Sequence, residues 1–145
     1  MGHKMGKRFF LFLLFFIFFS CTQAGIRPHH ETLKEAWYKY WSYKKAGDFK
    51  KAYYYENISF KMPLETYLQI CAKQSMMVKG FKFIKIGKEG SGPYGSTPVE
   101  MELVTSFISP PAFPVPDKLT TKLKDYWIKK QGRWYHLRPG VARFW

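Results

Sequence analysis

Two residues near the ends of an aromatic-rich stretch, residues 125–137, have side chains that could transfer protons. These are Asp125 and His136, and they are eleven positions apart. A carboxylate or an imidazole that is removed from water can act as a general acid or base. Acid–base catalysis by Asp125 and His136, with help from Tyr126 or Tyr135, is therefore one hypothesis for this chain.

The stretch is predicted to be a β-hairpin that brings Asp125 and His136 together. Gln131-Gly132 separates two aromatic runs, and glycine is favoured where a short hairpin loop needs positive φ. With these two residues as the loop, Lys130 lies opposite Arg133 and His136 opposite Trp127. The strands are then expected over 119–130 and 133–138.

The same register also gives Asp125 and His136 a purely structural role. Asp125 lies opposite Arg138, so the two are expected to form a cross-strand ion pair. His136 beside Trp127 is typical of a packed core histidine. The sequence contains no metal-ligand cluster, phosphate-binding loop or nucleophile motif, since His29 and His30 have no third ligand near them. We expect no cofactor and no metal, and we expect binding rather than catalysis.

Residues 1–20 are predicted to be an export signal. Three cations precede an uninterrupted apolar run, residues 9–19. Eleven apolar residues are too few for a membrane-spanning helix, which needs about 20, but they suit the apolar region of a signal peptide. The segment Phe18-Phe19-Ser20-Cys21 resembles a bacterial lipobox, in which the cysteine is acylated and becomes the new N-terminus.

Three fates of this leader follow from the sequence. Lipidation at Cys21 is the preferred interpretation, and residues 21–30 then form the lipidated N-terminus and tether. Cleavage after Ala24 would instead release a soluble secreted protein, because Thr22 and Ala24 are small. An uncleaved anchor is the third alternative. Thr22 is not the aspartate that often retains lipoproteins at an inner membrane, so an outer-membrane location is favoured if two membranes exist.

The net positive charge of the chain indicates which kinds of partner it could meet. Among 145 residues, 24 are Lys or Arg and 10 are Asp or Glu, and the leader removes three of the cations. In an envelope compartment, such a basic surface is expected to meet anionic lipid or cell-wall polymer and not nucleic acid. Lys44, Lys45, Lys50 and Lys51 are the residues expected to form a basic face. Cys71 is expected to be a buried, inert thiol without a disulfide partner.

Helical spacing dominates the first half of the exported part. Thr32 and Glu35 predict a capping box, and Gly47 predicts a left-handed C-terminal cap. The inward stripe of this helix is predicted to be Leu33, Ala36, Trp37, Tyr40, Trp41 and Lys44. A second helix is expected over 49–56, and a third is expected to begin at Pro63, with Leu64, Tyr67, Leu68 and Cys71 inward. The turn between the first two helices also resembles that of a tetratricopeptide repeat, although no 34-residue recurrence supports it.

From Met77 the apolar residues follow a strand-like pattern. A strand is expected over 78–88, and the regular alternation from Val99 to Phe107 predicts a half-buried strand. Four prolines exclude residues 109–117 from a central strand, and residues 141–145 are expected to add an edge segment. Helices followed by antiparallel strands predict an α+β fold, with N-terminal helices packed on the sheet in one domain, residues 31–145.

The order of three motifs resembles the nuclear transport factor 2-like, or cystatin-like, superfamily. These motifs are the capped aromatic first helix, Gly47-Asp48-Phe49 leading into the second helix, and Asp125-Tyr-Trp127 followed by Gly132-Arg-Trp134-Tyr135. The resemblance implies a curved sheet that encloses a conical pocket. Because members include enzymes, binding modules and envelope lipoproteins, the fold does not select a function.

We therefore expect a cell-envelope lipoprotein with a non-catalytic module that binds a small apolar ligand or an envelope protein partner. The candidate pocket residues are Trp37, Trp41, Asp125, Trp127, Trp134 and His136. A cone-fold isomerase or dehydratase that uses Asp125 and His136 is the first alternative. A passive accessory lipoprotein is the second.

Overall fold

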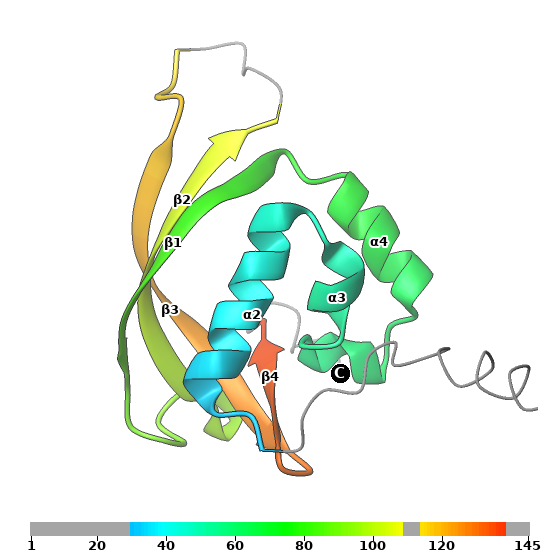
Figure 1. Cartoon of the computed structure of the whole chain (residues 1–145), viewed down its shortest axis with the longest axis vertical. Coiled ribbons are helices and arrows are strands. Elements are labelled where there is room, and N and C mark those ends of the chain that lie inside the picture. Colours follow the sequence, from blue (N-terminus) through cyan, green and yellow to red (C-terminus); the bar gives the residue numbers. More distant parts are fainter. Residues whose placement is uncertain (1–29, 109–113, 139–145) are drawn as a thin grey trace, which may run out of the picture.

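The computed structural model describes residues 30–108 and 114–138, which form three α-helices packed on a four-stranded antiparallel sheet (Figure 1). The predicted α+β class is thus confirmed for this part of the chain. The leader, Cys21 and Ala24 lie outside the described residues, as does the edge segment expected at 141–145. Residues 109–113 also lie outside them, and the prolines at 114 and 116 belong to no strand.

The first described helix, α2 (Leu33–Ala46), begins and ends as the sequence predicts. Thr32 and Glu35 form a reciprocal capping box, and Gly47 adopts φ 74° as the left-handed cap. The predicted inward stripe is buried along its whole length, from Leu33 to Lys44. Burial of Lys44 removes this residue from the basic face expected with Lys45, Lys50 and Lys51.

The second helix is shorter than predicted. Helix α3 (Phe49–Tyr53) is capped by Asp48 and stops three residues before Glu56; a 3-10 turn, η2 (Asn57–Phe60), follows. The cause is a tertiary contact, because the backbone N–H of His136 donates to the carbonyl of Tyr55 at 2.6 Å, and Glu56 forms a parallel bridge with His136. Helix α4 (Leu64–Ala72) follows Pro63 and buries Tyr67 and Cys71 as expected, whereas Leu64 and Leu68 are only half-buried. Cys71 is a free thiol.

The sheet is an antiparallel meander in the order β1-β2-β3-β4. Its strands are β1 (Met76–Ile86), β2 (Thr97–Phe107), β3 (Leu119–Lys130) and β4 (Arg133–Leu137), and a short 3-10 turn, η3 (Pro93–Gly95), lies between β1 and β2. Strand β1 begins and ends two residues earlier than predicted. The β3–β4 register is the predicted one, with Lys130 opposite Arg133 and Trp127 opposite His136. Gln131 and Gly132 both have positive φ, as this two-residue turn requires.

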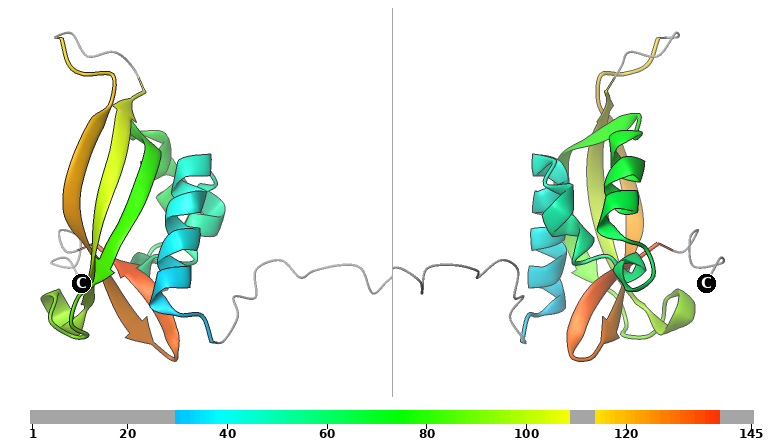
Figure 2. Two further views of the ribbon diagram at one scale, coloured as in Figure 1. Left: turned by 60° about the vertical axis from the view of Figure 1, so that its left-hand side comes forward. Right: turned by 90° about the vertical axis from the view of Figure 1, so that its right-hand side faces the viewer.

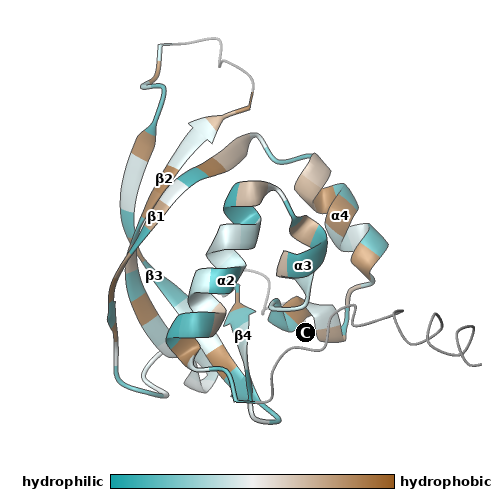
Figure 3. Cartoon of the chain, in the orientation of Figure 1, coloured by the Kyte–Doolittle hydropathy of each residue, from teal (hydrophilic) through white to brown (hydrophobic). Residues whose placement is uncertain are grey.

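The helices lie on one side of the sheet (Figure 2). Alternate residues of each strand face them, and Figure 3 shows hydrophobic residues interspersed with hydrophilic ones along β3. Val99 and Met101 are fully buried beneath α2, together with Trp37, Tyr40 and Trp127. The core therefore lies between α2 and the inner face of the sheet.

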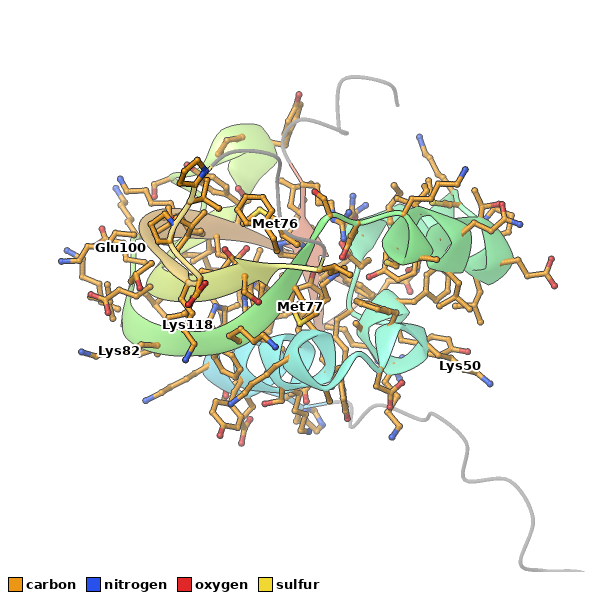
Figure 4. All side chains as sticks on the ribbon, turned by 90° about the horizontal axis from the view of Figure 1, so that it is seen from above. Lys50, Met76, Met77, Lys82, Glu100 and Lys118 are labelled. Carbon is orange, nitrogen blue, oxygen red and sulfur yellow. The ribbon has the colours of Figure 1, made fainter. Side chains whose placement is uncertain are left out.

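The outer face of the sheet is polar and basic. Lys85, Glu100 and Lys124 lie in one cross-strand row, and Lys82, Glu102 and Lys122 lie in the next. Exposed ion pairs join Lys85 to Glu100 at 3.5 Å and Lys122 to Glu102 at 3.7 Å. Figure 4 shows Lys82 and Glu100 on the opposite side of the molecule from Lys50. Both pairs are open to solvent, and they therefore add little stability.

Candidate functional site

Strands β3 and β4 bring Asp125, Trp127 and His136 together beneath α2, as the hairpin register predicts. The Nε2 atom of His136 lies 2.7 Å from Oδ1 of Asp125. Oδ2 of Asp125 accepts hydrogen bonds from the indole N–H groups of Trp41 at 2.8 Å and Trp127 at 2.9 Å. All four side chains are buried. A helix and two strands thus converge on one carboxylate.

The predicted ion pair between Asp125 and Arg138 is wrong. Arg138 instead donates from Nη2 to Oε1 of Glu56 at 2.6 Å. The physical reason is that both oxygens of Asp125 already have donors: His136 on one side and two indole N–H groups on the other. The partner of Arg138 comes from the segment after α3, which the hairpin register alone could not place.

Glu56 is the central residue that the sequence did not single out. Its Oε1 accepts from Arg138, from the Tyr40 hydroxyl at 2.7 Å and from the Tyr67 hydroxyl at 3.2 Å. Its Oε2 lies 3.0 Å from Nδ1 of His136. Although its side chain is wholly buried, the charges of His136 and Arg138 outweigh the effect of burial and hold the pKa of Glu56 well below its usual range.

His136 is held as an imidazolium between the two carboxylates. Both of its ring nitrogens face carboxylate oxygens, and a histidine donates from both nitrogens when it is protonated. Burial alone would lower the pKa of His136, but Asp125 and Glu56 raise it to about 9. The ring also stacks on Tyr40, with centroids 4.5 Å apart and planes inclined by 22°.

This arrangement suits a structural role better than proton transfer. A general acid or base must present a ring nitrogen to its substrate, whereas both ring nitrogens of His136 face buried carboxylate oxygens. Asp125 has no oxygen without a donor. Among the described residues, no group of three or more His, Cys, Asp or Glu side chains is placed to hold a metal ion. The network joins α2, α4 and the Glu56 segment to β3 and β4.

The raised pKa of His136 predicts that the protein loses stability in mild alkali. The ordinary pKa of histidine is 6.5 and the folded value is about 9, so the stabilisation is fully present below pH 6.5 and disappears as the pH rises through 9. We expect the urea midpoint of the wild type to fall between pH 7 and pH 10. His136→Gln should be less stable at pH 6, and its midpoint should change much less over that range. Parallel pH profiles for the two proteins would contradict the assignment.

Two of the predicted pocket residues lie apart from this network. Trp37 is packed in the core, with its ring edge-on to Phe81 and Phe83 at centroid distances of 5.4 Å. Trp134 is a buried core residue of β4, and Lys129 Nζ lies 5.5 Å from the centroid of its ring. Trp41, Asp125, Trp127 and His136 therefore form one cluster, whereas Trp37 and Trp134 are core residues beside it.

The burial of the inner sheet face decreases along the strands. Val99 and Met101 on β2 are fully buried, whereas Leu103, Thr105 and Phe107 further along the same face are half-buried. Their partners on β1 and β3 follow the same trend: these are Phe81, Val78, Met76 and Leu119, which are half-buried, and Thr121, which is exposed. The end of the sheet formed by the last residues of β2 thus presents partly accessible apolar side chains on its helix-facing side.

Comparisons with known proteins assign no family. No protein-family model, curated protein or solved structure matches the chain. Within the residues that the structure describes, none of the helices has the length and apolar character needed to cross a membrane.

Proposed function

We propose that this chain is an exported lipoprotein, anchored through Cys21, whose folded part is a non-catalytic binding module for a small apolar ligand. The apolar leader and the Ser20-Cys21 pair support the anchor. The order of the helix and hairpin motifs supports a domain of the nuclear transport factor 2-like kind, in which a curved sheet encloses a conical pocket.

One observation carries the binding function: apolar side chains on the inner sheet face become accessible toward the end of β2. A core that only stabilised the fold would gain from covering Leu103, Phe107 and Met76, because each square ångström of apolar surface removed from water contributes about 25 cal/mol. Apolar pockets with a few polar groups are the usual form of small-ligand sites. The closed network around His136 argues against the acid–base alternative.

Neighbouring residues of β2 provide a matched test. Leu103 faces the helices and Val104 faces outward, and both are half-buried. We expect the processed protein in phosphatidylcholine vesicles to bind 1-octanol, measured by calorimetry against protein-free vesicles. Leu103→Gln should weaken this binding by at least tenfold, and Val104→Gln should leave it unchanged. Equal effects of the two substitutions, in variants that retain the wild-type circular dichroism, would refute an inner-face site.

The anchor is tested separately by mass spectrometry of the N-terminal peptide. Lipidation predicts a peptide that begins at Cys21 and carries acyl chains. A peptide that begins at Gly25 would show cleavage after Ala24 and a soluble secreted protein. Membrane fractionation of the same cells would test the expected outer-membrane location where two membranes exist.

A further inference from the structure

The buried charges around His136 include one cation more than the carboxylates neutralise. Glu56 and Asp125 face His136 from both sides, and Arg138 pairs with Glu56. With His136 as an imidazolium, these four groups are neutral together. Lys44 is the additional cation, and its charge interacts with both Arg138 and Glu56.

Lys44 is an unusual residue for its position. It continues the inward stripe of α2, one turn beyond Tyr40 and Trp41, and is 9% exposed. Its Nζ lies 4.8 Å from the centroid of the Phe49 ring, and no salt bridge links it to a carboxylate of the described residues. Burial and the charge of Arg138 lower its pKa. A buried cation without a counter-ion is costly, so an anion beside Lys44 would be stabilising.

Arg138 can share such an anion. Within residues 30–108 and 114–138, its guanidinium contacts a carboxylate through Nη2 alone, and the group has five N–H donors in all. Its side chain is 29% exposed and lies 5.8 Å from the centroid of the Tyr67 ring. N–H groups of Arg138 therefore remain for a carboxylate or phosphate, the groups whose geometry guanidinium matches best.

Lys44 lies toward the same end of the fold as the accessible apolar face. Helix α2 and strand β2 both run toward the upper end of the molecule in Figure 1, and β4 runs in the same general direction but ends beside the middle of α2. Lys44 is in the last turn of α2, Arg138 follows β4, and the half-buried Leu103 and Phe107 are near the end of β2. Val78 and Leu103 also pack against the buried cluster that contains Trp37, Tyr40 and Trp41 of α2.

We propose that Lys44 and Arg138 bind the head group of an anionic amphiphile, a single apolar chain that ends in a carboxylate or phosphate. The apolar chain lies on the inner face of the sheet, against Leu103 and Phe107. The inference rests on the proposed function and adds the chemical class of the ligand. It also gives the buried Lys44 a function, which membership of a solvated basic face does not.

Probes with one chain length and different head groups test the inference. The processed protein in phosphatidylcholine vesicles is titrated with octanoate, octyl phosphate and 1-octanol by calorimetry, with protein-free vesicles as the blank. We expect at least one of the two anions to bind tenfold or more tightly than the alcohol. Lys44→Met, which preserves the apolar stem, should abolish that preference, and Lys45→Met, on the exposed side of the same turn, should preserve it.

The outcomes separate this inference from the function on which it rests. Octanol binding with no preference for either anion, or a preference that survives Lys44→Met, would overturn the inference and leave the apolar site in place. Failure of all three probes to bind would refute both the anion site and the proposed apolar binding function. Octanoate and octyl phosphate distinguish a carboxylate head from a phosphate head, and circular dichroism of both lysine variants verifies that the fold is intact.

Discussion

Replacing Glu56 with alanine should lower the free energy of unfolding by about 3–5 kcal/mol, because Arg138 loses its carboxylate partner and His136 keeps only one of its two, Asp125. Glu56 accepts from Arg138, Tyr40 and Tyr67 and faces His136, and its side chain is fully buried. Its removal takes one acceptor from each of these four residues at once. Urea unfolding followed by tryptophan fluorescence at pH 7 measures the loss.

Glu100 supplies the matched control for this prediction. It also forms an ion pair, with Lys85, but on the solvated outer face of the sheet. Glu100→Ala should change the free energy of unfolding by about 0–1 kcal/mol, the usual range for exposed pairs. A loss for Glu56→Ala no greater than that for Glu100→Ala would show that the buried network does not hold the helices to the sheet.

Trp127→Ala should be comparably destabilising, at about 3–5 kcal/mol, for a different reason. Trp127 is 0% exposed, and its ring lies edge-on to Tyr40, with centroids 5.6 Å apart. Truncation leaves a large cavity and also removes one of the two indole donors to Asp125. Thermal unfolding followed by far-ultraviolet circular dichroism measures the effect.

Tyr38 is the aromatic control for the truncation. It lies on the exposed side of α2, is 61% exposed and makes one edge-on contact with Phe81. Tyr38→Ala should cost no more than about 1 kcal/mol, the range of a single aromatic pair. If both alanine variants unfold at the same temperature, the core does not lie where the burial pattern places it.

The sequence predicted correctly those caps, turns and helix faces that depend on residues close together in the chain. Three of these features each need a particular residue type at one position and can therefore be recognised in the sequence. They are the capping box at Thr32, the left-handed Gly47 and the Gln131-Gly132 loop. The β3–β4 register followed from that loop, and the register in turn placed Asp125 beside His136. Periodicity likewise predicted which side of α2 is buried.

Long-range contacts account for what was missed. Glu56 was predicted to belong to the second helix, residues 49–56. Its segment leaves helical geometry because Tyr55 accepts a backbone hydrogen bond from His136, some 80 residues later. No local pattern marks such a contact. The wrongly predicted ion pair of Arg138 with Asp125 has the same cause. The actual partner of Arg138 is Glu56, whose position depends on that long-range contact.

The bridge between Glu56 and His136 has a consequence for how copies of the chain meet one another. Where the segment after α3 lies beside β4, it occupies backbone groups that another chain could otherwise extend by strand addition. On the opposite border, β1 has two register irregularities and exposed lysines, which make a poor template for a foreign strand. Copies of this chain at high concentration would therefore meet one another without pairing their sheets edge to edge.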